Sequence, residues 1–416
     1  MERTILHCDC NSFFASVEAA INPSYRNVPM AVCGSQEDRH GIVLAKNEEA
    51  KKYGIKTAET VYSAKKKCPS LVIAHPHYDQ YEIYSKKVNA IYAEYTDKVE
   101  PFGIDESWLD VTASRRVFGS GEEIAELIRQ RVKRELGITV SIGVSFNKVF
   151  AKLGSDYKKP DAITVISKDN FEQIVYPLPA SDLLFVGRRT AEELLRIGVK
   201  TIGDLANTSR DMLKHKFGKM GDMLYDYANG LDESPVASDE NREVKSISNG
   251  FTFRHDLVTR EDCRVGLDFL CEEIGAKLRA KSLKCNTVAI TIKDTRLKSI
   301  QRQRPLENAS DISREISDLA FKILCDEWNE NIPIRMLTVS VTGLVDASSS
   351  FTQLDLFSDM EENVREKDKK REETVDAIRK KFGTSSISSG AYYNTDIGVG
   401  VKKKLELYAR KRPSPK

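Results

Sequence analysis

Two segments far apart in the chain read as buried strands that lead directly into acidic residues. The first covers residues 4–8 and precedes Asp9, and the second covers 99–104 and precedes Asp105 and Glu106. If these strands are neighbours in a sheet, the carboxylates meet, and two unit charges about 4 Å apart repel by roughly 4 kcal/mol at an effective dielectric of about 20. Only protons or cations stabilise such a cluster, and Mg²⁺ is a divalent ion that prefers oxygen ligands. A pair of such ions transfers phosphoryl and nucleotidyl groups, so the pattern favours a two-metal site.

The same residues allow two other interpretations. The acids could be surface carboxylates, and adjacent strand residues point to opposite faces unless the backbone bends, which Gly103 would allow. His7, Cys8 and Cys10 are zinc-type ligands, but structural zinc usually requires a second ligand pair at matching spacing, which the sequence lacks. Two buried thiols are therefore favoured over a zinc site.

Composition predicts a globular protein with several domains. The 416 residues exceed the size of one hydrophobic core and predict roughly two to four domains. A net charge of +2 does not by itself indicate a nucleic-acid binder, so local charge must be considered instead. Eight cysteines without paired spacing are typical of reduced thiols. The chain also has no apolar run long enough for a membrane span and no signal peptide, so we expect a cytoplasmic protein without membrane contact.

Hydrophobic periodicity predicts a first α+β domain. A strand at 1–10, helices at 78–95 and 122–136, and a strand at 139–144 form a split βαβ unit with a mixed sheet, interrupted by an insert at 11–77. The first of these helices has an apolar stripe that predicts packing in the core: Tyr81, Tyr84, Val88, Ile91 and Tyr95.

The rest of the chain divides into four stretches. Residues 167–232 are helical with short loops, and a polar stretch at 232–243 reads as a linker. A second α+β domain follows at 246–345. Residues 358–416 are rich in charge, and we expect them to be partly helical but weakly packed.

Two segments favour phosphate contacts, each with a simpler alternative. Two short helices in 183–205, joined through a glycine turn, could direct backbone N–H groups at a phosphate or form a plain bundle. Residues 277–304 carry nine basic side chains against one acid, Asp294. Basic residues on a strand edge can simply prevent edge pairing, but this run continues through the following loop, which favours a phosphate-tracking surface.

Two shorter motifs are also ambiguous. Lys159 precedes Pro160, and its side chain is either solvated or directed at an anionic ligand. The apolar peptide 353–357 lies among polar residues, and such a peptide either covers a core or docks into a groove of a partner.

Taken together, these motifs resemble those of the Y-family DNA polymerases of the bacterial translesion type, over residues 1–357. Residues 9–18 are similar to the first catalytic motif of that family and 104–107 to the second. The remaining similar segments are the palm lysine segment at 145–153 with Lys159 and Pro160, the thumb motif at 183–205, the start of the little finger at 245–247, and the clamp-binding peptide at 353–357.

The resemblance implies an α+β fold in the right-hand arrangement of a polymerase, with a ferredoxin-like palm, small fingers, a helical thumb and a separate α+β little finger. The implied parts are the palm at 1–10 and 78–166, the fingers at 11–77, the thumb at 167–232, a linker at 233–243, the little finger at 244–346, and a tail at 347–416 that contains the clamp peptide.

The resemblance also implies roles at the catalytic centre. Asp9, Asp105 and Glu106, with the backbone carbonyl of Cys10, would hold two Mg²⁺ ions. Phe14 would be the steric gate that excludes a ribose 2′-hydroxyl. The implied triphosphate contacts are the amides of Ser12 and Phe13 and the side chains of Lys51 and Lys159.

Binding roles follow for other segments. The DNA contacts implied in the thumb and in the basic run are Gly187, Lys293, Arg296, Lys298, Arg302 and Arg304. The clamp contacts are Gln353, Leu354, Leu356 and Phe357. The expected partners are primer–template DNA, deoxynucleoside triphosphates and a sliding clamp, and we expect a monomer that copies damaged templates with low fidelity in DNA repair and damage tolerance.

The chain departs from the family at 47–51, where many bacterial members carry Tyr and Arg and this sequence has Glu48 and Lys51. Lysine keeps the charge but lacks the bidentate guanidinium group. Two alternative functions are a nucleotide cyclase with a palm-like fold, which would form product without DNA, and a non-catalytic DNA-binding repair module, which would not need the acids.

Overall fold

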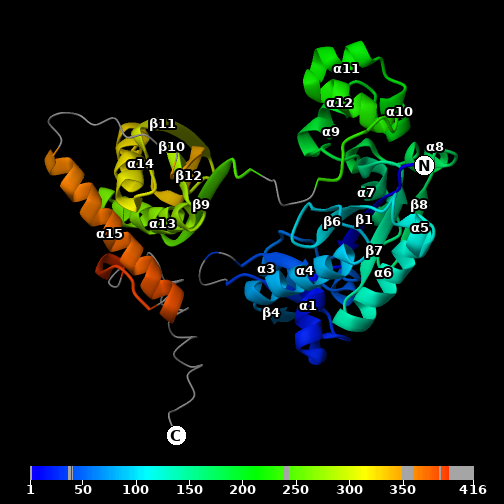
Figure 1. Cartoon of the computed structure of the whole chain (residues 1–416), viewed down its shortest axis with the longest axis horizontal. Coiled ribbons are helices and arrows are strands. Elements are labelled where there is room, and N and C mark those ends of the chain that lie inside the picture. The colour runs from blue at the N-terminus through cyan, green and yellow to red at the C-terminus, as the bar shows by residue number, and fades with distance from the viewer. Residues whose placement is uncertain are drawn as a thin grey trace, which may run out of the picture. The chain divides into compact units, whose positions relative to one another are not determined.

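The computed structural model describes residues 2–35, 39, 41–237, 243–348, 359–383 and 386–392. The chain divides into two units, which are shown in Figure 1 and are described separately. Unit 1 comprises Met1–Ser35 and Gly41–Arg242, and unit 2 comprises Gln36–His40 and Glu243–Lys416. No helix in the described ranges is both long enough and apolar enough to cross a membrane.

A five-stranded sheet with the order β5-β6-β1-β7-β8 organises unit 1. Its central strand, β1 (Ile5–Cys10), is buried along its whole length and runs antiparallel to β6 (Glu106–Asp110) and β7 (Val140–Ser145). β5 (Val99–Pro101) pairs with β6, and β8 (Ile163–Ile166) lies parallel to β7. The mixed sheet predicted from the sequence is therefore confirmed, but the strand predicted at 99–104 ends at Pro101, before the chain turns.

Helices cover both faces of this sheet. α4 (Tyr78–Ala93) and α6 (Gly121–Leu136) pack their apolar stripes on one face, and a short helix, α5 (Arg115–Phe118), precedes α6. α7 (Lys148–Tyr157) lies on the other face, pressed against β7 at Gly143. A Cβ atom at Gly143 would lie 1.8 Å from the Ala151 carbonyl oxygen, so glycine is required for this close approach.

The insert between β1 and α4 forms a small α/β body. It begins with α1 (Phe13–Ile21) and η1 (Pro23–Tyr25). Its three-stranded sheet has the order β3-β2-β4 and encloses a small core of its own. The strands and helices of this body are β2 (Met30–Cys33), β3 (Val43–Lys46), α2 (Glu48–Lys51), α3 (Val61–Lys67) and β4 (Val72–Ala74).

The last part of unit 1 is helical, as predicted. Its apolar core includes Leu194, Leu205 and Leu224 and continues into Phe150 and Leu153 of α7, so these helices are packed onto the sheet domain. The helices are α8 (Phe171–Val175), η2 (Ala180–Asp182), α9 (Arg188–Arg196), α10 (Ile202–Ala206), α11 (Arg210–Phe217) and α12 (Lys219–Ala228).

Unit 2 is built on a four-stranded antiparallel sheet with the order β11-β10-β12-β9. The helices α13 (Arg260–Ala280) and α14 (Ser313–Glu327) pack against one face of this sheet around a large apolar core. The strands are β9 (Ser246–Leu257), β10 (Leu283–Asp294), β11 (Ser299–Ser310) and β12 (Ile334–Asp346).

The region after β12 corrects one expectation. We predicted weak packing beyond residue 358, but α15 (Asp359–Phe382) and η4 (Gly390–Tyr392) pack onto the helices of unit 2. Glu372 is buried and accepts hydrogen bonds from the backbone nitrogen and hydroxyl of Ser313, at the start of α14. Tyr392 is buried in the apolar core of unit 2. The sequence suggested a solvated segment because this contact is made mainly by charged residues.

Candidate active site

The pairing of β1 with β6 brings the predicted acids to one end of the sheet. Asp9 lies opposite Glu106 in the antiparallel register. The next residue, Cys10, donates its backbone N–H to the Asp105 carbonyl at 3.0 Å. Residues 102–105 form the turn between β5 and β6, where the amides of Phe102 and Gly103 both approach the Glu106 carbonyl. The bend that the two adjacent acids require is therefore present.

The three carboxylates have different electrostatic surroundings. Burial, followed by the charges of Asp9 and Glu106, raises the pKa of Asp105 to about 6. Burial also raises the pKa of Asp9, although Lys159 opposes this shift. Glu106 behaves in the opposite way, because the contact with His7 at 3.3 Å and the contacts with Lys152 lower its pKa to about 2. The repulsion expected among clustered acids therefore contributes, after burial, to the raised pKa of Asp105.

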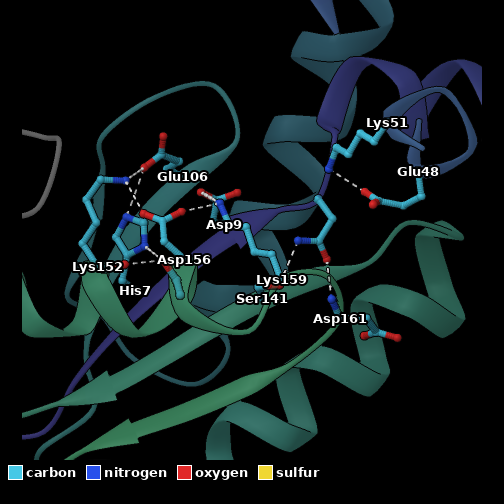
Figure 2. Close-up of polar contacts among 12 residues, drawn as sticks. His7, Asp9, Glu48, Lys51, Glu106, Ser141, Lys152, Asp156, Lys159 and Asp161 are labelled. Atoms are coloured by element: carbon cyan, nitrogen blue, oxygen red, sulfur yellow. Dashed lines mark hydrogen bonds and ion pairs between the residues drawn. The ribbon is translucent and has the colours of Figure 1, made fainter. Parts of the chain in front are cut away.

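Two lysines neutralise the other two acids, as Figure 2 shows. The Lys159 Nζ atom lies 2.6 Å from Asp9 and 2.7 Å from Asp156. The Lys152 Nζ atom lies 2.5 Å from Glu106. Both lysines come from the segment that begins with α7, which lies directly over β1. The sequence left Lys159 either solvated or directed at an anionic ligand, so neither its contact with Asp9 nor the contact of Lys152 with Glu106 was predicted.

The donor set fits a hard divalent cation. Carboxylate oxygens on adjacent strands are the ligands that Mg²⁺ prefers, and the repulsion at Asp105 is the kind that such a cation relieves. Within the described residues, no group of three or more His, Cys, Asp or Glu side chains is already arranged around a metal position. Asp9 and Glu106 point to lysines instead, so a cation would bind to them only after these ion pairs open.

The turn after β1 is held by a residue that the sequence interpretation left without a role. Asn11 donates to the Ser141 hydroxyl at 2.8 Å, and its side-chain oxygen accepts from the Asp161 backbone nitrogen at 2.8 Å. This amide therefore connects the turn to β7 and to the loop that carries Lys159. Its position two residues after Asp9 was the available sequence signal.

The predicted nucleotide-binding residues lie around this turn. Ser12 has a left-handed backbone (φ 47°) and its side chain does not cap α1, which begins at Phe13. Lys51 pairs with Glu48 at 2.6 Å, and Glu48 also accepts from the Ser12 hydroxyl at 3.3 Å. Glu48 and Lys51, the two residues at which the sequence departs from the family, therefore form an ion pair beside Ser12.

The predicted DNA contacts belong to both units. Gly187 lies at the N-terminus of α9, with no neighbour within 4 Å of a Cβ at that position. Lys293, Arg296 and Lys298 lie at the β10–β11 hairpin. The other two predicted contacts are paired with acids of α14: Arg302 with Glu327 at 3.0 Å, and Arg304 with Asp326 at 2.7 Å. The predicted clamp residues, Gln353, Leu354, Leu356 and Phe357, lie outside the described residues.

The cysteines near the site are buried thiols. Cys8 and Cys10 are fully buried, and burial raises the pKa of both. The nearby His7 uses its ring nitrogens toward Ser155 and Glu106. These contacts agree with the choice of two buried thiols over a zinc site.

Comparison with known families gives three matches along the chain. Residues 8–156 match the impB/mucB/samB family, residues 244–356 match the C-terminal domain of that family, and residues 181–232 match the thumb domain of DNA polymerase iota.

Individual relatives align over nearly the whole length. DNA polymerase IV of Acetivibrio thermocellus is 49% identical over 391 residues, which cover 94% of this chain and 97% of the relative. DNA polymerase IV of Clostridium kluyveri is 38% identical, with 94% and 98% covered, and DNA polymerase IV 1 of Bacillus subtilis is 37% identical, with 94% and 93% covered. A solved Y-family DNA polymerase chimera matches the fold with a TM-score of 0.73 at 23% identity, over 82% of this chain and 99% of the chimera.

Proposed function

The chain belongs to the impB/mucB/samB family of Y-family DNA polymerases, and from that premise we propose the roles of its individual residues. The protein is a template-directed DNA polymerase of the translesion type, a metal-dependent enzyme whose substrates are DNA and nucleotides. The cyclase and the non-catalytic module are set aside, because polymerase relatives align over 94% of the chain.

Asp9, Asp105 and Glu106, with the Cys10 carbonyl, hold two Mg²⁺ ions in this proposal. When bound, such ions supply activation of the primer 3′-hydroxyl and neutralisation of charge on the triphosphate. The single observation that carries the assignment is the register that places Asp9 opposite Glu106 beside a turn in which the pKa of Asp105 rises to about 6. Among the described carboxylates at this end of the sheet, Asp105 is the one without a lysine within ion-pairing distance.

The chain's own residues bind and orient the nucleotide. Lys159 and Lys51 exchange their present carboxylate partners for phosphate oxygens, and the amides of Ser12 and Phe13 donate to the same triphosphate. A helix N-terminus favours negative charge, and α1 begins at Phe13 without a side-chain cap. Phe14, one residue into the same helix, excludes a ribose 2′-hydroxyl.

The remaining roles complete the proposal. The palm at 1–10 and 78–166, the thumb at 167–232 and the fingers at 11–77, apart from residues 36–40, belong to unit 1, and the little finger at 244–346 belongs to unit 2. Gly187 and the basic hairpin contact phosphates of the primer–template, and residues 353–357 bind a sliding clamp. The protein acts as a monomer in the cytoplasm, where its DNA substrate is located.

Primer extension tests the metal-site assignment. We expect Asp105→Ala and Glu106→Ala each to reduce extension by more than about a thousandfold, because the charge that binds the ions is lost. Binding of a labelled primer–template should stay within about twofold of the parent protein, because these acids do not contact the duplex. Asp97→Ala, which removes an exposed acid before β5, is the matched control. Extension at parental rates by either active-site variant would contradict the assignment.

A further inference from the structure

A buried contact behind the proposed steric gate links two helices. Phe14 and Glu18 lie four residues apart on α1, so they share one face of that helix. Tyr81 of α4 contacts both of them. Its ring stacks on Phe14 with centroids 4.1 Å apart and planes 10° apart, and its hydroxyl donates to the Glu18 carboxylate at 2.5 Å.

The Glu18 carboxylate is almost completely removed from water. The residue is 2% exposed, and a buried charge is costly unless hydrogen bonds compensate for it. Besides Tyr81, its partners are the backbone nitrogen of His77 at 3.3 Å and the Nδ1 atom of His77 at 2.9 Å. Burial, followed by the Glu18 contact, raises the pKa of Tyr81, so its hydroxyl stays protonated and remains a donor.

The same contact limits where the Phe14 ring can lie. One face of Phe14 is covered by Tyr81, and the rings of Phe13 and Tyr78 lie 5.9 Å and 6.0 Å away by centroid distance. A side chain that excludes one hydroxyl group must not retreat by more than a fraction of an ångström. Tyr81 can prevent that retreat only if its own ring is fixed, and the bond to Glu18 fixes it.

We propose that Glu18 and Tyr81 are positioning residues for sugar selection: the Glu18 carboxylate holds the Tyr81 ring, and this ring holds Phe14 against the nucleotide sugar. The inference rests on the proposed role of Phe14 as the steric gate. It differs from simple packing of α1 on α4, because it requires the hydroxyl of Tyr81 and not only its ring.

The test measures kcat/KM for dCTP and for CTP opposite an undamaged template guanine. Tyr81→Phe removes one hydroxyl and keeps the ring, and we expect it to lower the preference for dCTP on the order of tenfold, mainly through a lower KM for CTP. Glu18→Leu should have the same effect, whereas Glu18→Gln should retain most of the preference, because its amide oxygen still accepts from Tyr81. Tyr84→Phe, on the same helix and packed against the same core, is the matched control.

A double-variant comparison separates positioning from general packing. In a Phe14→Ala background there is no ring to hold, so Tyr81→Phe should leave the already reduced preference unchanged. An unchanged preference in Tyr81→Phe alone would overturn the inference, and so would an equal loss in both backgrounds. If Glu18→Leu fails to fold, Tyr81→Phe decides the question, since it leaves the packing intact. An unchanged preference in Phe14→Ala would instead contradict the proposed steric gate itself.

Discussion

Asp105 and Glu106 are adjacent in sequence but experience opposite electrostatic environments. Glu106 has two partners, His7 and Lys152, that favour its charged form. Asp105 is partly buried next to two other carboxylates, and these effects disfavour its charge. A group held in an unfavourable charge state lowers the stability of the free enzyme, which is a common property of catalytic sites.

Neutralising Asp105 should therefore stabilise the metal-free protein. Because the pKa of Asp105 rises from 3.8 to about 6 on folding, the folded state binds this proton more tightly, and stability decreases as pH rises through that range. Above about pH 6 the full penalty applies, so Asp105→Asn should add about 1 kcal/mol at pH 7.5. Thermal unfolding in EDTA measures this, and the gain should shrink toward pH 4. A variant that is less stable at pH 7.5, or equally stabilised at both pH values, would refute the prediction.

The positions of the acids that we propose as catalytic could be predicted from the sequence, because Asp9 lies near the end of β1 and Asp105 and Glu106 come shortly after β5. The expectation that the acids meet assumed that residues 4–8 and 99–104 are neighbouring strands, and this is wrong in detail: β6, which begins at Glu106, pairs with β1 and separates it from β5. The contact between Tyr81 and Glu18 could not be predicted in this way. Helical spacing placed Tyr81 in the core, but its hydroxyl partner is fixed by the packing of α4 against α1.

At the scale of elements, strand alternation divides the basic residues of the β10–β11 hairpin. Arg302 and Arg304 lie opposite Ile290 and Val288, so they share the face that packs against the helices. Lys293 lies opposite Ser299 and points to the other face. The number of basic residues can be read from the sequence, but their assignment to faces depends on the register between the two strands.

This division predicts unequal contributions to DNA binding. Replacing Lys293, Arg296 and Lys298 together with alanine should reduce the slope of log affinity against log salt by about one per lost phosphate contact. Replacing Arg302 and Arg304 should change the slope less, because acids of α14 already neutralise them. Fluorescence anisotropy with a labelled primer–template at several salt concentrations provides the slopes. Equal changes in the slope per replaced residue in the two variants would show that the position of a basic residue on one face or the other does not affect DNA binding.

Helix α15 is rich in charged residues, but one of its acids, Glu372, is buried. Its sequence resembles a solvated helix, yet the side chain of Glu372 in α15 contacts the first residue of α14, Ser313. Glu372 also pairs with Arg279, which pairs in turn with Asp376 at 2.6 Å. A buried carboxylate at a helix N-terminus satisfies free backbone N–H groups. Composition cannot reveal such a contact, because it depends on one acid among many that are exposed.

Removal of this acid should loosen the docked helix. Glu372→Ala leaves the Ser313 N–H without its acceptor and Arg279 with one partner fewer, so we expect unit 2 to lose about 2–3 kcal/mol of unfolding free energy. Urea denaturation followed by the fluorescence of Trp328 would measure the loss. The neighbouring Glu373 is exposed, and Glu373→Ala should cost less than about 0.5 kcal/mol. Similar values for both variants would mean that the buried contact does not stabilise the domain.

At the scale of the whole molecule, the residues that we propose as functional are distributed over two units. The proposed catalytic and nucleotide-binding residues all lie in unit 1, whereas the basic hairpin and the docked α15 lie in unit 2. The net charge of +2 conceals this arrangement, since it averages a carboxylate cluster in one unit with a basic hairpin in the other. The charge of the whole chain therefore did not predict where the acidic and basic clusters lie, whereas the local sequence did.

The proposed clamp peptide 353–357 lies in the sequence between β12 and α15, two elements of unit 2. Replacing Gln353, Leu356 and Phe357 with alanine keeps the length of this connection while removing the side chains expected to enter a groove on the clamp. Extension by the polymerase alone should stay within about twofold of the parent, because none of these residues belongs to the catalytic centre. Stimulation by a DNA-loaded clamp should disappear, since tethering raises the effective concentration of enzyme at the primer end only while the peptide binds. Product-length distributions with and without the clamp separate the two effects. If the clamp lengthens products equally for the parent and the variant, another surface of the protein must contact it.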